Sequence, residues 1–229
     1  MKKVGILRRA TLLLAVVVMI PVSIMAQEEE KSSAFDVGGD LVSSYLWRGT
    51  KFGNGPAIQP YLEVAFGNLA IGAWGNYNFT SNEAAEADLY ISYGFDFGLS
   101  VGLTDYYFPG SDYFKYDTID GAHGFEINLG YEIKGFSIAA NYMLNKAPVA
   151  GTAGGDMYFE LGYAFNSFGI FVGGGDGWHT SDGEFGVTNV GVTASKEIHF
   201  TEKFSLPING AVILNPERQQ FNVVVGVSF

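Results

Sequence analysis

The sequence predicts an all-β fold: a transmembrane, antiparallel, up-and-down β-barrel of about twelve strands that follows a cleavable signal peptide. Aromatic residues make up 15% of the chain, and 31 residues are glycine. Apolar and polar residues alternate with a period of two through most of the sequence, which is typical of strands with one apolar face. Beyond the N-terminal segment, no stretch stays apolar for the roughly 20 residues that a membrane helix needs.

The N-terminal segment has the three parts of a secretory signal peptide. Basic residues come first, an apolar stretch runs from Ala10 to Ile24, and the small residue Ala26 offers a cleavage point before Gln27. The basic residues are Lys2, Lys3, Arg8 and Arg9. We therefore expect a signal peptide over residues 1–26, a short periplasmic tail over 27–34 and an outer-membrane barrel over 35–229.

The charge and the cysteine content exclude several functions. The chain has 13 basic and 24 acidic residues, and its formal net charge is −11. Because the basic residues of the signal peptide are removed on export, the exported chain is more acidic still. It lacks the basic surface that a phosphate backbone requires, so we expect no nucleic-acid partner. Without cysteine the chain forms no disulfide, and we expect neither a metal site nor a cofactor.

Twelve segments alternate between apolar and polar residues, and we expect each to be a strand. In the second segment, Leu62 and Val64 lie on one face, and Gln59 and Glu63 lie on the other. In a membrane barrel the apolar face contacts lipid and the polar face lines the lumen. The segments are 35–48, 57–66, 69–79, 85–95, 97–108, 124–132, 135–145, 156–165, 168–178, 187–197, 204–214 and 219–229.

The connections between these segments alternate in length. We expect short turns at 67–68, near 96, at 133–134, at 166–167 and near 199–203. We expect longer loops at 49–56, 80–84, 109–123, 146–155 and 177–186, with a last short connection at 215–218. Short periplasmic turns and longer extracellular loops occupy opposite rims of outer-membrane barrels. The alternation therefore favours a barrel over a soluble β-sandwich, and an even strand count places both ends of the barrel in the periplasm.

Outward aromatic residues gather near both ends of the expected strands, as in the two interfacial girdles of a membrane barrel. On the turn side they are Phe35, Phe66, Tyr93, Phe95, Tyr131, Phe136, Tyr163, Phe165, Phe204 and Phe229. On the loop side they are Tyr45, Trp47, Tyr77, Phe79, Tyr107, Tyr142 and Trp178.

Short motifs along the chain resemble a known family. The segment Ser43–Gly49 reads SSYLWRG and is followed by Pro56–Gln59, which reads PAIQ. Together with segments 86–90 and 106–110, these motifs resemble the Gcw_chp (TorF-like) family of exported bacterial proteins of unknown function. Three positions depart from that family's usual residues: Ser44, Trp47 and Pro60. The resemblance implies an exported, porin-like barrel and no particular substrate.

Alternation places charged and aromatic side chains on the inner face of the expected barrel. If Phe229 is level with Val37, Arg48 and Arg218 lie side by side near the extracellular mouth and need carboxylates or an anion nearby. The inward carboxylates are Glu86, Asp88, Glu126, Asp156 and Glu160, and the inward aromatics are Tyr61, Trp74, Tyr90, Tyr106 and Tyr158. Opposed charges of this kind set selectivity in pores. The alternative is that these residues pair with one another and fill the interior.

We expect a passive, porin-like channel for small hydrophilic solutes in the outer membrane of a Gram-negative bacterium, with outer-membrane lipid and the barrel-assembly machinery as partners. One alternative is a closed barrel with a structural or adhesive role, and another is a lipid-modifying enzyme. His179 and Ser181 have the His-x-Ser spacing of an outer-membrane phospholipase. They lie in a loop-like run, however, and the nearby Asn189 faces the lumen, so we expect no catalysis. Asp176, Asp182 and Glu184 match no known calcium-loop spacing.

The segment Phe221–Phe229 ends on an aromatic residue, as do the last strands of bacterial outer-membrane barrels, and we expect Phe229 to form part of an assembly signal. The variant Phe229→Asp should insert poorly into the outer membrane, because a charge replaces a girdle anchor while the lumen is unchanged. Heat-modifiable electrophoretic mobility and surface abundance measure this insertion. Values equal to those of the unmodified protein would contradict the expectation.

Overall fold

The structure is a computed structural model that describes residues 35–80, 84–201 and 204–229. The expected signal peptide and periplasmic tail lie outside the described residues. Within these ranges no helix has the length and apolarity that a membrane crossing would need. The described chain consists of β-strands and their connections, together with a short 3-10 helix, η1 (Gly177–His179).

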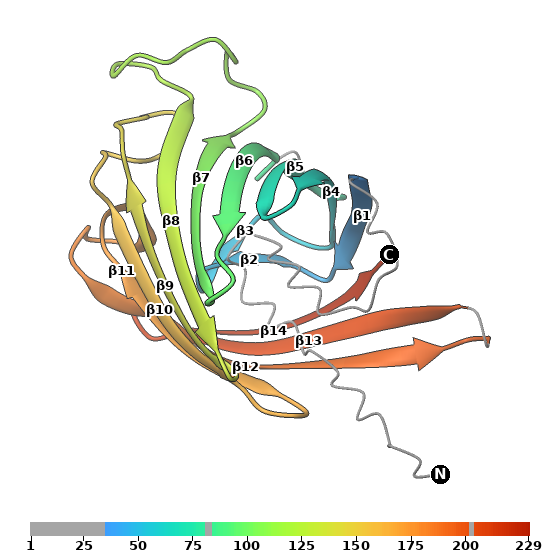
Figure 1. Cartoon of the computed structure of the whole chain (residues 1–229). Helices are drawn as coiled ribbons and strands as arrows, with labels where there is room; N and C mark the ends of the chain where they lie inside the picture. Colours follow the sequence, from blue (N-terminus) through green and yellow to red (C-terminus); the bar gives the residue numbers. More distant parts are fainter. Residues whose placement is uncertain (1–34, 81–83, 202–203) are drawn as a thin grey trace, which may run out of the picture.

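In the described chain, twelve strands form one closed antiparallel barrel (Figure 1). They are β1 (Phe35–Val42), β4 (Ala57–Phe66), β5 (Leu69–Asn78), β6 (Glu86–Gly94), β7 (Leu99–Tyr107), β8 (His123–Ile133), β9 (Phe136–Met143), β10 (Met157–Ala164), β11 (Gly169–Gly175), β12 (Gly186–His199), β13 (Ser205–Asn215) and β14 (Gln220–Ser228). A separate hairpin of β2 (Tyr45–Trp47) and β3 (Thr50–Phe52) lies between β1 and β4 in the chain. The predicted fold class is therefore confirmed.

The ring closes where β1 pairs with β14. Asp40 is the register partner of Ser228, and the backbones of Gly39 and Phe229 exchange two hydrogen bonds of 3.0 Å. The predicted register, with Phe229 level with Val37, is therefore wrong by two residues. Because the shift is even, each side chain keeps the face that alternation gave it.

The predicted first strand, 35–48, is too long. The wall strand β1 ends at Val42, and the chain then turns into the barrel to form β2 and β3. At the turning point the Ser43 amide donates to the Val225 carbonyl (2.8 Å), and the Val225 amide donates to the Ser43 hydroxyl (3.0 Å). The other predicted strands are confirmed, with boundaries that differ by a few residues.

Outward side chains form an apolar belt around the barrel. Examples from five strands are Val37, Leu62, Leu129, Val172 and Val223, all of them well exposed. Soluble proteins rarely expose contiguous apolar patches larger than a few hundred Å². An apolar belt that runs around the whole ring is suited to contact with lipid, so the fold is a transmembrane barrel. The β-sandwich alternative is excluded.

The aromatic girdles are confirmed only in part. On the turn side, Phe35, Phe66 and Phe204 are exposed as a girdle requires. On the loop side, Tyr45 and Trp47 are buried inside the barrel. Trp178 packs against the same buried cluster, so its assignment to the girdle was also wrong. These three residues lie in segments that leave the wall, so the alternation of a wall strand does not apply to them.

On the inner wall, aromatic side chains pack over glycines of neighbouring strands. A Cβ atom at Gly72 would run into the Tyr90 ring, and one at Gly173 would run into the Tyr158 hydroxyl. Gly191 stands in the same relation to Phe171 on the neighbouring strand. Inward rings thus lie flat over glycines of adjacent strands, which explains why the chain is rich in both residue types.

The predicted alternation of loop lengths is confirmed. The short turns after β4, β6, β8, β10 and β12 lie at the rim of β1's first residue, and the longer connections lie at the opposite rim together with the short β13–β14 connection, 216–219. We expect the longer loops to be extracellular. An epitope tag inserted after Phe114, which is 85% exposed in the β7–β8 loop, should bind antibody on intact cells. A matched tag after Lys134, in the β8–β9 turn, should bind only after permeabilisation. Labelling of the Lys134 tag on intact cells would reverse the topology.

Candidate functional site: a hairpin inside the lumen

The residues Tyr45–Phe52, which we call the lumen hairpin, lie inside the ring of strands (Figure 1). Trp47 pairs with Thr50, so Arg48 and Gly49 form a two-residue turn. Their φ angles are 49° and 83°, as in the type I′ turns that suit tight hairpins. Glycine adopts this conformation freely, whereas arginine does so at a cost that surrounding contacts must offset.

The tip of the lumen hairpin is docked against the inner wall. The Gly49 carbonyl accepts a hydrogen bond from the side-chain amide of Asn215 on β13 (3.1 Å). A Cβ atom at position 49 would collide with the backbone of Thr188 on β12. Position 49 therefore requires glycine for two reasons, its positive φ angle and its close approach to the Thr188 backbone. The hairpin leaves the wall beside β1 and β4 and ends against β12 and β13.

Aromatic packing fixes the lumen hairpin laterally. Tyr45, Trp47, Tyr106 and Met143 form the buried apolar cluster of the barrel. The Trp47 ring meets the Trp178 ring edge-on, with centroids 5.0 Å apart, and lies 5.6 Å from the Tyr106 ring. Trp178 belongs to η1, so a second connection, between β11 and β12, also folds into the mouth.

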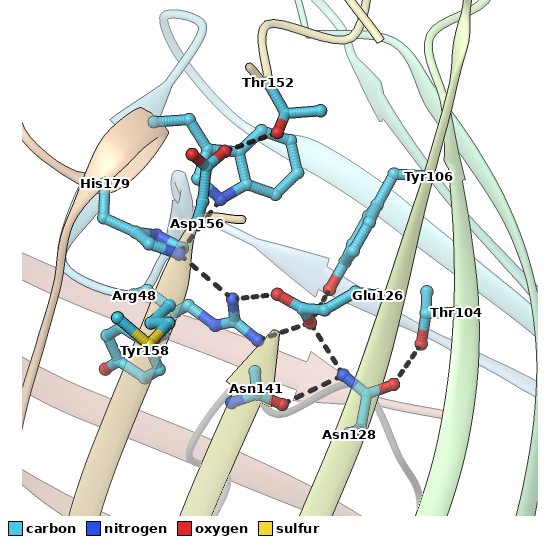
Figure 2. A network of polar contacts seen from close by, with 12 residues as sticks. Arg48, Thr104, Tyr106, Glu126, Asn128, Asn141, Thr152, Asp156, Tyr158 and His179 are labelled. Carbon is cyan, nitrogen blue, oxygen red and sulfur yellow. Dashed lines mark hydrogen bonds and ion pairs between the residues drawn. The ribbon is translucent and has the colours of Figure 1, made fainter. Parts of the chain in front are cut away.

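Arg48 forms a two-point ion pair with Glu126 on β8 (Figure 2). Both Nη atoms lie 2.7 Å from a carboxylate oxygen, and the two side chains are only 2% and 1% exposed. The Arg48 Cζ atom also lies 4.5 Å from the centre of the Trp47 ring and 4.6 Å from that of Tyr158. Such a pair is strongly oriented, because both hydrogen bonds are charge-assisted and parallel.

The Glu126 carboxylate is held by the wall itself. The Tyr106 hydroxyl donates to Oε2 at 3.0 Å, and the Asn128 amide donates to the same oxygen at 2.7 Å (Figure 2). Asn128 is held in turn by Thr104 and Asn141. A carboxylate surrounded by donors from β7 and β8 is pre-organised to bind a cation.

His179 completes the surroundings of the guanidinium. Its Nε2 atom accepts from the Trp178 indole at 3.0 Å and lies 3.4 Å from an Arg48 Nη atom. Burial and the adjacent Arg48 charge lower the pKa of His179 well below its usual value. The ring is therefore neutral at pH 7, which leaves Nε2 as an acceptor and places the proton on Nδ1.

The structure places the predicted inward carboxylates inside the barrel. Glu86, Asp88, Glu126, Asp156 and Glu160 are all buried. Tyr45 donates to Glu86 at 2.8 Å, Asp156 bonds Thr152, and Glu160 accepts from Tyr158 and Asn189. Of the predicted inward aromatics, Tyr90, Tyr106 and Tyr158 are buried, Trp74 packs against the apolar cluster, and Tyr61 donates to Asp36. Most of these residues thus have partners inside the barrel, as in the alternative left open by the sequence. Asp88 accepts from the Tyr107 backbone amide at 3.3 Å, and its Oδ2 atom has no hydrogen-bond partner among the described residues.

The two predicted arginines have separate partners. Arg48 binds Glu126, whereas the Arg218 Nε atom lies 3.5 Å from its neighbour Glu217 and its side chain is 30% exposed. The predicted side-by-side pair relied on β1 reaching residue 48, and β1 ends six residues earlier, at Val42. The structure instead brings Arg48 to a carboxylate that alternation had placed on a distant strand.

The loop residues weighed for catalysis or calcium contact other groups. The Ser181 hydroxyl bonds Glu217, whereas His179 faces Trp178 and Arg48, so these two side chains form no pair. Asp176 and Asp182 each accept from a nearby backbone amide. Across the described residues, no group of three or more His, Asp or Glu side chains is arranged to hold a metal ion.

Sequence reasoning missed the polar residues that support Glu126, namely Thr104, Asn128 and Asn141, and it missed His179 as a neighbour of Arg48. One local signal was available for the lumen hairpin. Tyr45, Leu46 and Trp47 are consecutive large apolar residues and all three are buried. A run that is apolar on both faces fits poorly to a wall strand with a polar side.

No protein-family model matches the chain, and the comparison with curated protein sequences found no match. Among solved structures, the fold is similar to a mutant porin of Rh. blastica (TM-score 0.38, 14% identity), covering 76% of this chain and 55% of the porin. It is also similar to the outer-membrane phospholipase dimer of Salmonella typhi (TM-score 0.43, 12% identity), covering 87% and 93%. This chain thus spans about half the length of the porin. Likenesses this distant transfer no function.

The buried ion pair generates a stability prediction. Arg48→Ala should lower the free energy of unfolding by about 3–5 kcal/mol, because it leaves the Glu126 charge buried and unpaired. Adding Glu126→Gln should restore part of the loss. The matched control Arg218→Ala removes a partly exposed pair and should cost less than about 1 kcal/mol. Urea unfolding in detergent micelles measures all three, and equal losses for Arg48→Ala and Arg218→Ala would contradict the assignment.

Proposed function

We propose that this protein is a porin-like channel of the Gram-negative outer membrane for small hydrophilic solutes, and that the lumen hairpin closes it. The observation that carries this proposal is the polar character of the wall that faces the hairpin. Glu126, Asn128 and Glu160 line that wall, and all three would be well solvated if the hairpin moved out and water entered.

A permanently closed barrel would be expected to fill differently. Small barrels close their interior with packed side chains, and apolar packing is the stable choice for a site that is never hydrated. Here the wall strands contribute carboxylates and amides to the interior, and the lumen hairpin, which is tethered to β1 and β4, covers them. Twelve strands lie between the barrels that side chains fill and those that leave an open pore. A movable hairpin would let one barrel change between a filled interior and an open pore.

The attachment of the lumen hairpin suits such a movement. Val42 and Ala57 are register partners on β1 and β4, so the whole segment between them is one connection of an ordinary antiparallel strand pair. Displacement of the lumen hairpin alone, Tyr45–Phe52, would leave the barrel ladder intact. The hairpin contacts the wall through side chains and through the Gly49 backbone, whereas backbone hydrogen bonds to the wall occur at the ends of the segment, at Ser43 and Pro56.

The inner wall below the hairpin supports passage of small solutes. Toward the turn side, several inward positions are small, among them Ser92, Gly102, Gly130 and Ser137. Small inward side chains leave the bore to water, as polar lumens of channels require. With buried carboxylates in excess over basic groups, the channel should prefer cations.

The complete burial of the hairpin favours a second candidate, a closed barrel with a structural or adhesive role. Leu46, Trp47 and Arg48 are as inaccessible as residues of a protein core. If the hairpin never leaves, no solute passes, and the acidic outer loops would carry the function.

Replacing residues 43–56 by the two-residue turn Asn-Gly separates these candidates. Since Val42 and Ala57 are already paired, a type I′ turn joins them without changing the register. The shortened protein in a planar bilayer should show cation-selective single-channel steps several-fold larger than those of the unmodified protein.

The matched control shortens residues 111–120 of the β7–β8 loop, where Phe114 and Ile119 are 85% exposed, and should leave conductance unchanged. A hairpin-free barrel that folds and stays silent would overturn the channel and favour the closed barrel.

A further inference from the structure

The Arg48 guanidinium is surrounded by residues from three other parts of the barrel. We call the wall residues Glu126, Tyr158 and His179 the cation cradle. Glu126 supplies two carboxylate oxygens at 2.7 Å, Tyr158 supplies a ring face at 4.6 Å from Cζ, and His179 supplies an acceptor at 3.4 Å. The three come from β8, β10 and η1, so none of them belongs to the lumen hairpin.

The cradle is held in place by its own supports. Tyr106 and Asn128 orient the Glu126 carboxylate. The Tyr158 hydroxyl donates to Glu160 at 2.5 Å and accepts from Asn189 at 3.0 Å, which fixes the ring that faces the guanidinium. Trp47, whose ring centre lies 4.5 Å from the Arg48 Cζ atom, belongs to the hairpin and not to the cradle. If the hairpin leaves, Glu126 and Tyr158 keep these supports and lose the cation, while His179 keeps its hydrogen bond from Trp178 and loses its contact with Trp47.

Without Arg48, the buried carboxylates of the lumen would need another cation. Among the buried residues of the described chain, Arg48 is the single Lys or Arg, against the carboxylates Glu63, Glu86, Asp88, Glu126, Asp156 and Glu160. A buried carboxylate without a cation is costly. Water alone would hydrate Glu126 in an open lumen, but a cation that matches its two oxygens would bind there in preference.

The geometry specifies the kind of cation. Two parallel N–H groups facing one carboxylate, with the plane of the cation against an aromatic face, are the contacts of a guanidinium. An ammonium group is a compact point charge that cannot make the paired contact. The Arg48 side chain also fills the cradle imperfectly, because its buried Nε atom has no hydrogen-bond partner among the described residues. Asn141 Nδ2 on the adjoining wall is likewise unpartnered.

We infer that the cation cradle is a lumenal binding site for solutes that carry a guanidinium group, and that Arg48 occupies it in the closed state as an internal substitute. The solute and the hairpin then compete for one site. This inference rests on the proposed channel, since the solute must reach the cradle through the lumen. It gives the channel a substrate class, guanidinium compounds such as arginine, and a way of opening that the substrate itself favours.

The test uses the purified barrel in which Asn-Gly replaces residues 43–56, titrated with methylguanidinium at millimolar concentration in a calorimeter. Binding should be saturable, and methylammonium at equal ionic strength should bind at least about tenfold more weakly, because it loses one charge-assisted contact. Adding Glu126→Gln should weaken methylguanidinium binding about ten- to a hundredfold. Arg218→Ala is the matched control and should change nothing.

Absence of saturable binding, or equal binding with Glu126→Gln, would overturn the inference. Conductance is measured separately, so the two proposals fail independently. If the hairpin-free barrel conducts but does not bind methylguanidinium, the proposed channel stands and the proposed binding site is wrong. If it binds methylguanidinium but does not conduct, the binding site stands and the channel is wrong.

A second variant keeps the inference testable if the hairpin-free barrel does not fold. In the full-length chain with Arg48→Ala, methylguanidinium should raise the urea midpoint toward that of the unmodified protein, and methylammonium should not. The double variant Arg48→Ala/Glu126→Gln should show no such rescue. Rescue that is absent from Arg48→Ala, or equal in the double variant, would overturn the site.

Discussion

The closed backbone ladder is the constraint on which this structure depends. Hydrocarbon offers no hydrogen-bond partners, so every strand in a membrane must pair on both edges. β1 pairs with β4 along its whole length, but with β14 it shares a short register from Asp40 to Val42, extended by Gly39 and Ser43. The seam of the barrel is therefore its shortest strand pairing, and it ends where the chain turns inward.

The inward turn links the closure of the ring to the closure of the lumen. After Ser43 the chain leaves the wall and forms the lumen hairpin, which crosses the interior with Arg48 in its turn. Guanidinium does not give up its proton when buried, so Arg48 requires a fixed anion. Glu126 meets that need with both oxygens. A buried pair of this kind contributes little net stability, but it specifies one position for the hairpin, because any other leaves two charges unpaired.

The inner wall is built to accept a polar occupant. Glycines make room for the inward tyrosines, and the tyrosines orient the carboxylates beside them. At Glu63, Glu126 and Glu160 the wall thus presents acceptors that are held by wall tyrosines and not by the hairpin. The same arrangement that stabilises the closed lumen would meet a solute of matching chemistry when the lumen opens. Occlusion and recognition are then two uses of one set of side chains.

The amino-acid sequence by itself determined the barrel, its strands, the alternation of its loops and the inward direction of Glu86, Asp88, Glu126, Asp156 and Glu160. A period of two is a local property, and it survives even a register error of two residues, because both faces are preserved. Only the tertiary structure decided the path of residues 43–56 and the partner of Arg48. The segment Tyr45–Trp47 is a strand in either arrangement. Its position in the barrel depends on the contacts of the adjoining Arg48 with residues 78 and 131 positions away. Local alternation carries no information about such contacts, because they form only when distant strands have closed around the hairpin.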